Sequence, residues 1–326
     1  MKVLSLFDGI SCARVALDRA GIAVESYLAS EVDPKAIQVT QSRWPETTQL
    51  GDVRKVHIPA GSIDLLIGGS PCTDLSIAKA GRQGLDGEHS SLFWEYVRVL
   101  RETNPRWFIL ENVASMPKKD KDIITQELGV EPVLFNASLV SAQSRKRLFW
   151  TNIKFDLPSD RGIVLKDILQ PDEEVDESMF VKGTLHITNS TNKIGHIGNT
   201  DGQANRVYST EGKSVTLSAQ GGGGGAKTGL YCVGYVEKEH TQGYRVYDAD
   251  GKSTSLTTAG GGLGATTGLY RTESRIRKLT PIECERLQGL PDNYTQGIPK
   301  THRYKCLGNG FNVDVVAHIL SHLRHC

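Results

Sequence analysis

The sequence predicts an α/β fold: a mixed, mostly parallel sheet with helices on both faces. Over roughly the first 155 residues, short apolar runs alternate with helical patterns, which is typical of parallel strands joined by crossover helices. The chain has 326 residues, which is enough for a second domain. A duplicated segment rich in Gly, Thr, Ser and Tyr indicates that this second domain is smaller and β-rich.

The elements of the first domain follow in order along the chain. Strands are expected at 4–7, 27–29, 65–67 and 108–110, with helices at 13–20 and 34–44. Glycines punctuate the next stretch, 74–90, where the apolar pattern fades. We expect a closing lid there.

Later segments predict a linker and two helices. The acidic stretch 156–177 contains two prolines and is expected to be a linker. A helix is predicted to begin at Thr280, because proline follows at its first position and Gly289 stands at its end. The apolar spacing at 313–323 predicts another helix.

An internal repeat lies between these segments. Residues 206–231 recur 39 residues later as 245–270, with 16 of 26 aligned positions identical. Each copy has β-forming residues, a Gly-Lys-Ser turn and a glycine-rich stretch, which predicts strand, turn, strand and loop. Neither copy has the spacing of a phosphate-binding loop, which argues against nucleoside triphosphate binding. We divide the chain into domains at 1–177 and 178–278 and a final segment at 279–326.

Charge and cysteine content restrict the class of protein. The net charge of the chain is only +1, but residues 182–278 contain 12 Lys and Arg against 7 Asp and Glu. This local surplus is expected of a domain that binds the phosphates of a nucleic acid; the alternative is an ordinary charged, solvated surface. No apolar segment approaches the roughly 20 residues of a membrane span, and no signal peptide is evident, so we expect a cytoplasmic protein without a membrane partner. Six scattered cysteines without a Cys-x-x-Cys pair argue against zinc or disulfides, and no metal site is predicted.

Three motifs place reactive side chains at the ends of predicted strands. Cys72 follows Pro71, shortly after an apolar run and a Gly-Gly pair. Because the φ of Pro71 is fixed, the Cys72 thiol is held in one direction, as a nucleophile requires. The alternative is a cysteine that packs in the core as an apolar residue. Glu111 ends a second apolar run. Arg145 and Arg147 stand at alternate positions, which places both guanidiniums on one face of a strand.

In this order, Pro-Cys, Glu-Asn-Val and Gln-x-Arg-x-Arg resemble the catalytic motifs of the cytosine-C5 DNA methyltransferases. The resemblance extends over nearly the whole chain, and it implies a Rossmann-like methyltransferase fold in which 178–278 is the target-recognition domain and 279–326 returns to the first domain. The first motif departs from the family pattern, because Ser5 replaces an acidic residue and Ser11 and Cys12 replace glycines.

The same resemblance implies S-adenosylmethionine as cofactor. Its expected contacts lie in the first motif, after the second and third strands, beside the catalytic cysteine, in the helix after the catalytic loop and in the last motif. In that order they are Phe7, Asp8, Gly9 and Ile10; Glu31, Asp52 and Val53; Pro71; Leu92; and Asn309 and Gly310. Glu31 is expected at the ribose hydroxyls and Asp52 at the adenine amine.

The implied reaction is methylation of cytosine C5 within a specific sequence of double-stranded DNA. Cys72 adds to C6 of a flipped-out base, Glu111 relieves charge at N3, and Arg147, supported by Arg145, holds the O2 edge. A monomer is expected, in a bacterial or phage-infected cell. The sequence leaves open whether a cognate restriction endonuclease accompanies it in a restriction-modification system, and which bases it recognises.

Three other functions compete with this interpretation. An RNA (tRNA) cytosine-C5 methyltransferase would use the same catalytic residues, although the long repeat-bearing insert favours duplex DNA. A DNA-binding regulator without catalysis is disfavoured because Cys72, Glu111 and both arginines are present. A nicotinamide oxidoreductase is disfavoured because the first loop lacks Gly-x-Gly-x-x-Gly.

Overall fold

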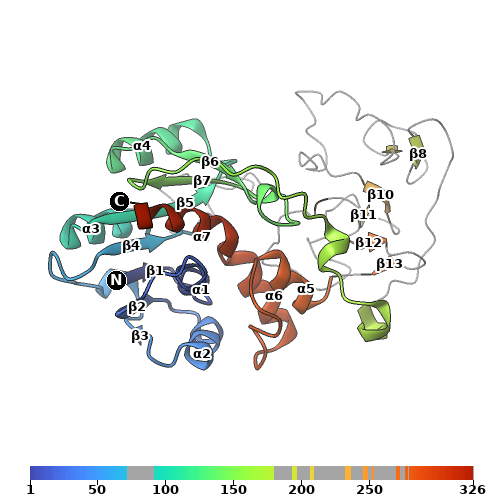
Figure 1. Ribbon diagram of the computed structural model, residues 1–326, viewed down its shortest axis with the longest axis horizontal. Coiled ribbons are helices and arrows are strands. Elements are labelled where there is room, and N and C mark those ends of the chain that lie inside the picture. Colours follow the sequence, from blue (N-terminus) through green and yellow to red (C-terminus); the bar gives the residue numbers. More distant parts are fainter. Residues whose placement is uncertain are drawn as a thin grey trace.

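A computed structural model describes residues 1–71, 92–179, 252 and 279–325, together with the backbone of six short strands between 193 and 277. Its centre is a seven-stranded sheet (Figure 1). The strands are β1 (Lys2–Leu6), β2 (Ser26–Ser30), β3 (Thr48–Gln49), β4 (Leu65–Gly68), β5 (Trp107–Val113), β6 (Val133–Asn136) and β7 (Lys146–Thr151). The helices are α1 (Cys12–Arg19), α2 (Pro34–Arg43), α3 (Leu92–Thr103), α4 (Lys118–Leu128), α5 (Pro281–Leu287), α6 (Lys300–Asn309) and α7 (Val313–Ser321).

The sheet is mixed and mostly parallel, as predicted. Its strand order is β3-β2-β1-β4-β5-β7-β6, and β7 runs antiparallel to both of its neighbours. The order reverses between β1 and β4, which pair in parallel. Such a reversal opens a crevice at the carboxyl ends of the strands, where α/β proteins bind ligands.

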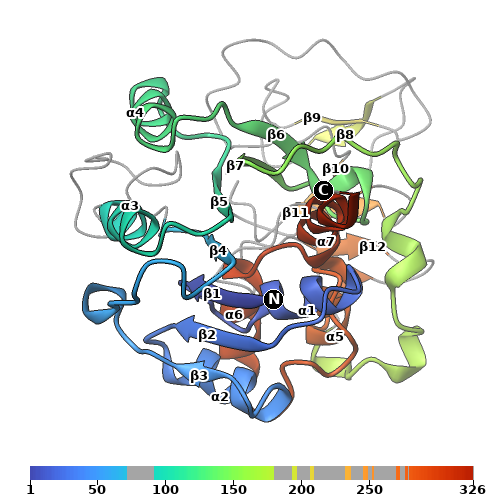
Figure 2. The same cartoon turned by 60° about the vertical axis from the view of Figure 1, so that its left-hand side comes forward.

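Two hydrophobic cores cover the two faces of the sheet. Helices α1, α2 and α7 pack on one face, around buried residues such as Val15, Val39 and Ile319. Helices α3 and α4 pack on the other, around Phe93 and Ile124. Figure 2 shows α3 and α4 on the side of the sheet opposite α1 and α7. Because α7 shares a core with α1, the end of the chain is part of the first domain.

The predicted linker is packed rather than extended across solvent. Residues 156–177 contain the short 3₁₀ helices η4 (Leu165–Ile168) and η5 (Asp172–Glu174), and they bury Leu165 and Val175. The apolar residues are too few and irregularly spaced to predict this from the sequence. The segment is also tied to α5, as described next.

Helix α5 begins with a capping box, in agreement with the sequence. Thr280 Oγ1 accepts a hydrogen bond from the Glu283 amide (3.2 Å), and the Glu283 carboxylate accepts one from the Thr280 amide (2.7 Å). The same two side chains also bind Gln170 of the preceding segment, through its amide and its side-chain oxygen. The cap therefore joins the return segment to the chain that leads out of the first domain.

The described strands of the repeat-bearing region form two small sheets. Strand β8 (Lys193–His196) pairs antiparallel with β9 (Arg206–Tyr208), and β10 (Cys232–Tyr235) pairs antiparallel with β11 (Arg245–Asp248). The second sheet continues with β12 (Leu269–Arg271) and β13 (Ile276–Arg277). In Figure 1 this sheet lies beyond α5 and α6 from the seven-stranded sheet.

The two strand pairs show that the repeat is longer than its identical residues indicate. Strand β10 begins 39 positions after β8, and β11 begins 39 positions after β9. The pairing of β8 with β9 and that of β10 with β11 also share an irregularity: the register shifts just before Gly195 in β8 and just before Gly234 in β10. The repeating unit therefore spans 193–231 and 232–270, two adjoining copies. The upstream part escaped the sequence comparison because few of its residues are identical, Gly195 with Gly234 and Gln203 with Gln242.

None of the helices in the described part of the chain is long and apolar enough to cross a membrane.

Thr280→Ala should lower the free energy of unfolding by about 1–2 kcal/mol, because it removes the cap oxygen of α5 and the contact with Gln170. Urea denaturation of the two proteins measures this. Thr301→Ala is the control: Thr301 is exposed within α6 and caps nothing, so its replacement should stay within about 0.5 kcal/mol. Equal effects of the two substitutions would contradict the capping role.

Candidate active site at the switch point of the sheet

The loop after β1 is the first wall of the crevice. Phe7, Gly9 and Ser11 all have left-handed backbone conformations, with φ of +56°, +61° and +58°. For Phe7 and Ser11 this conformation is strained, and it persists only where neighbouring contacts hold it. The Asp8 amide donates to the Ser30 carbonyl oxygen (3.1 Å) and the Gly9 amide to the Glu31 carboxylate (2.8 Å), so the loop after β2 holds the loop after β1.

The Asp8 side chain points into the core rather than into the crevice. Its carboxylate accepts hydrogen bonds from the hydroxyls of Tyr27 (2.6 Å) and Ser11 (2.5 Å). Burial raises the pKa of Asp8 to about 6, although the hydrogen bonds from Ser11 and Tyr27 oppose that rise. Asp8 thus fixes the loop from beneath, and a contact with a cofactor would come from its backbone.

Glu31 and Asp52 lie where the sequence predicts them, after β2 and β3. The Glu31 carboxylate accepts from the amides of Gly9, Val32 (2.7 Å) and Asp33 (2.8 Å), which fixes its orientation. Beside it the Val32 side chain is 68% exposed, which is unusual for a β-branched apolar residue. The Arg54 guanidinium binds the Asp52 carboxylate and lowers the pKa of Asp52 to about 2.

The loop after β4 is held by the Glu-Asn-Val motif. Buried Asn112 donates through its side-chain amide to Ser70 Oγ (3.1 Å). At Gly69, a Cβ atom would lie 2.8 Å from the Phe311 ring and 3.3 Å from a Glu111 oxygen, so only glycine allows this close approach. The turn that ends at Pro71 is therefore fixed by β5 and by the return segment.

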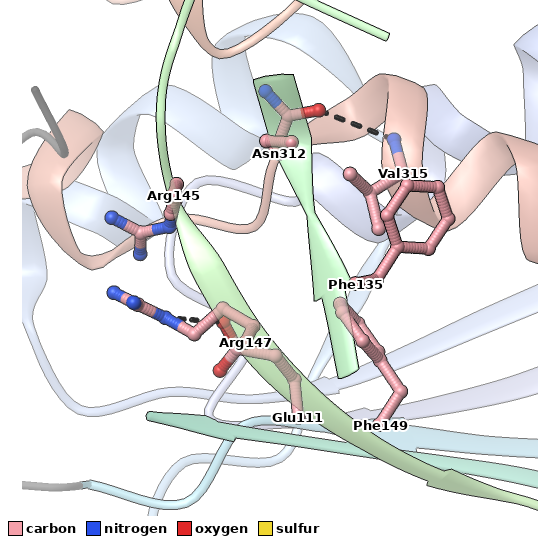
Figure 3. Close-up of a pocket in the computed structure, with 8 residues that line it drawn as sticks. Glu111, Phe135, Arg145, Arg147, Phe149, Asn312 and Val315 are labelled. Atoms are coloured by element: carbon pink, nitrogen blue, oxygen red, sulfur yellow. Dashed lines mark hydrogen bonds and ion pairs between the residues drawn. The ribbon is translucent and has the colours of Figure 1, made fainter. Parts of the chain in front are cut away.

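Glu111 and Arg147 form an ion pair in this crevice. Arg147 Nε lies 2.9 Å from Glu111 Oε1, and the two side chains are only 17% and 12% exposed. Figure 3 shows Arg145 and Arg147 extending in the same direction from β7, with Glu111 beside Arg147. The sequence predicted this shared face, although Arg145 lies one residue before the strand begins.

Arg145 joins the active-site strand to the return segment. Its guanidinium is buried and donates to the carbonyl oxygens of Gly308 (3.1 Å) and Gly310 (3.2 Å). Gln288 donates to the same Gly310 oxygen (3.2 Å), and Gln143 donates to Gln288 (3.3 Å). Because buried polar groups are costly unless paired, this network fixes where the return segment lies.

The last motif meets the first one through this contact. A Cβ atom at Gly310 would lie 2.9 Å from Cys12 Sγ, so the end of α6 packs directly on the start of α1. Asn309, the last residue of α6, is exposed there. Cys12 and Gly310, 298 positions apart in sequence, thus pack together beneath the crevice.

The predicted cofactor residues divide into two groups by exposure. The partly or fully exposed ones are Phe7, Gly9, Glu31, Asp52, Pro71, Leu92 and Asn309, and the buried ones are Asp8, Ile10, Val53 and Gly310. Ile10 and Val53 belong to the two hydrophobic cores, so their side chains support the crevice. The predicted nucleophile Cys72 and the predicted lid at 74–90 lie outside the described residues.

Arg98 is a supporting residue that the sequence did not indicate. From α3, its guanidinium donates to the carbonyl oxygens of Val53 and Val56 (both 3.0 Å), which fixes the turn that begins at Asp52. Glu95 and Glu102 hold the same guanidinium. An arginine with helix-spaced acidic neighbours resembles any solvated helix face, so no sequence signal distinguishes it.

Comparison with known proteins identifies the family. A family model described as C-5 cytosine-specific DNA methylase matches residues 1–325. The chain belongs to this family. It is 28% identical to the Type II methyltransferase M.HhaI of Haemophilus parahaemolyticus, over 98% of this chain and 93% of that protein. It is 26% identical to the orphan methyltransferase M.SPRI of Bacillus phage SPR, over 100% and 98% of the two chains.

Solved structures show the same fold for this C5 methylase. The Entamoeba histolytica methyltransferase EhMeth superposes with a TM-score of 0.70 at 14% identity, covering 100% of this chain and 98% of that one. The Dnmt2 methyltransferase of S. pombe gives a TM-score of 0.60 at 16% identity, covering 99% and 97%. The Rossmann-like methyltransferase fold, the enzyme class and the family predicted from the sequence are confirmed. The RNA alternative is not favoured, because the matching model is one of DNA methylases.

The described cysteines of this C5 methylase are poor nucleophiles. Burial raises the pKa of Cys12 and of Cys306 to about 12, and that of Cys284 well above its usual value. A thiol attacks as its thiolate, so these three are structural residues.

The raised pKa of Asp8 predicts a pH-dependent stability. The folded protein takes up this proton near pH 6, whereas the unfolded chain takes it up only near 3.8, so falling pH favours the folded state at this site. Asp8→Asn removes the titration. The unfolding free energy of the wild type relative to Asp8→Asn should therefore rise by up to about 3 kcal/mol as pH falls from 7 through 4. Urea denaturation at several pH values measures the difference, and parallel pH profiles would contradict it.

Proposed function

We propose that this enzyme transfers a methyl group from S-adenosylmethionine to C5 of cytosine within a specific sequence of double-stranded DNA, through a covalent bond between Cys72 and C6. One observation carries the proposal. The Glu111–Arg147 ion pair lies in the same crevice as the fixed turn that ends at Pro71, one residue before Cys72. A carboxyl group and a guanidinium thus lie beside the turn that leads, one residue later in the sequence, to the proposed nucleophile.

The chemistry requires a nucleophile because C5 of an aromatic cytosine is unreactive. When the Cys72 thiolate adds to C6, aromaticity is lost and C5 becomes enamine-like. After C5 is methylated, loss of its proton and cleavage of the sulfur–C6 bond restore the ring and the thiolate. The neutral state of the described cysteines supports Cys72 as the nucleophile.

Glu111 and Arg147 act together on the opposite edge of the base. Negative charge builds at N3 as the thiolate adds, and the Glu111 carboxyl group relieves it by sharing a proton. Arg147 uses Nε for Glu111 and still has other N–H donors, which suit the cytosine O2. Arg145 supports this arrangement from the backbone of 308 and 310.

The side chains around the crevice suit an adenosyl group. Glu31 accepts three amide hydrogen bonds but retains lone pairs for ribose hydroxyls, and exposed Val32 offers an apolar surface to a purine. Asp52 is an acceptor for the adenine amine. S-adenosylmethionine supplies an electrophilic methyl group when bound, and Phe7, Gly9, Pro71, Leu92 and Asn309 would complete its site. Backbone contacts from Asp8, Ile10, Val53 and Gly310 belong to the same proposal.

DNA recognition is assigned to the domain at 178–278, because the two tandem units and the surplus of Lys and Arg lie there. Cytosine C6 is inaccessible within a duplex, so the base must leave the stack. The names of the Haemophilus and phage relatives support a place in a restriction-modification system or as an orphan enzyme. We propose a monomer that acts in the cytoplasm.

Cys72→Ser should abolish methylation, because a serine hydroxyl is far less ionised than a thiol. Plasmid DNA from cells that express either protein is sequenced after bisulfite treatment, and the wild type should protect cytosines within one short sequence. Cys284→Ser is the control, since Cys284 is buried and neutral, and it should keep methylating. Retention of more than a few per cent of activity by Cys72→Ser would contradict the covalent step.

Purified wild-type enzyme is also assayed side by side on duplex DNA and on transfer RNA. Methyl transfer to DNA alone is expected. Transfer to RNA alone would contradict the proposed substrate while leaving the catalytic residues as assigned.

A further inference from the structure

Lys252 is the lysine of the second Gly-Lys-Ser sequence, and its ammonium group is held by the first domain. Its Nζ donates to the carbonyl oxygens of Ser138 (2.8 Å), Ser141 (3.3 Å) and Ile163, and it lies 3.2 Å from Asp160 Oδ1. The Lys252 side chain is only 19% exposed. Four acceptors around one compact ammonium form a cradle that suits lysine.

The first domain holds the walls of this cradle in place without Lys252. The Arg161 amide donates to the Leu139 carbonyl oxygen (2.9 Å), which joins the two segments that supply the acceptors. The Gly162 amide donates to Asp160 Oδ1 (2.8 Å) and orients that carboxylate. The carbonyl oxygens therefore converge whether or not a cation lies between them, and burying them without a donor is unfavourable.

The cradle is continuous with the arginine-bearing segment of the active site. Ser141 Oγ accepts from the Gln143 amide (3.2 Å) and from the Asn312 side chain (3.4 Å), and donates to the Ala137 carbonyl oxygen (3.1 Å). Gln143 and Asn312 in turn bind the Leu287 carbonyl oxygen of the return segment. A displacement at Ser141 therefore reaches the segment that leads to Arg145.

We propose that Lys252 is a positioning residue that docks the second repeat unit on the segment leading into Arg145 and Arg147. One contact then sets both the placement of the recognition domain and the presentation of the arginines to the base. This inference rests on the proposed function. The cradle accommodates one ammonium group, so Lys213, the matching lysine of the first unit, cannot occupy it while Lys252 does. The two copies therefore differ in role.

The matched lysines allow a controlled test. Lys252→Met and Lys213→Met make the same chemical change in the same Gly-Lys-Ser motif. On saturating duplex DNA, Lys252→Met should lower the turnover number between about ten- and a hundredfold, as expected when reacting groups are misplaced. Lys213 belongs to the domain assigned to DNA recognition, so the comparison is made at saturating DNA, where Lys213→Met should lower the turnover number far less than Lys252→Met does. Equal turnover numbers for the two variants would overturn the proposal.

Asp160→Asn adds a double-mutant cycle. In the wild-type background it should lower the turnover number by a smaller factor than Lys252→Met, because three carbonyl oxygens remain. In the Lys252→Met background it should have no further effect, since its partner is gone. A purely structural effect of Lys252→Met would instead leave the factor for Asp160→Asn the same in both backgrounds, and that result would overturn the proposal.

Hydrogen exchange gives a readout that does not need activity. Amides in 137–145 should exchange faster in Lys252→Met than in the wild type and remain unchanged in Lys213→Met; equal exchange in all three proteins would overturn the docking. If the wild type transfers no methyl group to DNA, the proposed function fails, while the exchange data still decide the contact. If Lys252→Met fails to fold, Asp160→Asn alone should accelerate exchange in the same segment.

Discussion

The buried Arg145 guanidinium is the contact on which the active site depends. By donating to the carbonyl oxygens of Gly308 and Gly310, it fixes the last motif of the chain against the strand that carries Arg147. Beside this contact, the end of α6 packs on the start of α1. The core that α7 shares with α1 also holds the return segment, but Arg145 is the contact that ties Gly308 and Gly310 to the active-site strand. Breaking such a buried charged contact is typically strongly destabilising.

Several motif residues hold the loops of other motifs in place, in addition to the roles proposed for them in binding a ligand. Asn112 holds the turn before Cys72, Glu31 holds the first loop, and Asp8 fixes that loop from the core. The proposed reaction would place a cofactor and a flipped base on the same nucleophile, and such a site needs each loop held to a fraction of an ångström. Much of the polar network therefore consists of contacts between motif residues and the loops that carry them. Its purpose is to keep two loops and the return segment in register.

The sequence predicted the parts of the fold that depend on local pattern. Alternating apolar runs indicated the strands, Thr280 with its following proline indicated the start of α5, and the spacing of Arg145 and Arg147 indicated a shared face. Contacts that depend on distant backbone carbonyl oxygens carry no such pattern. Arg98 and Lys252 belong to this class, because any sequence could place an acceptor at the far end of those side chains. The inward turn of Asp8, whose carboxylate accepts from the Tyr27 and Ser11 hydroxyls, had no sequence pattern either. The packed linker and the full length of the repeat also required coordinates.

The covalent step can be tested with duplex DNA that carries 5-fluorocytosine at the methylated position, since fluorine on C5 prevents the loss of a proton that would release the enzyme. In the presence of S-adenosylmethionine, intact mass measurement should show one enzyme joined to one DNA strand, and peptide mapping should place the bond at Cys72. Replacement of Cys72 by serine should remove the adduct. An enzyme that methylates ordinary DNA but forms no adduct, or forms one at Cys12, Cys284 or Cys306, would contradict the assignment of Cys72 as the nucleophile.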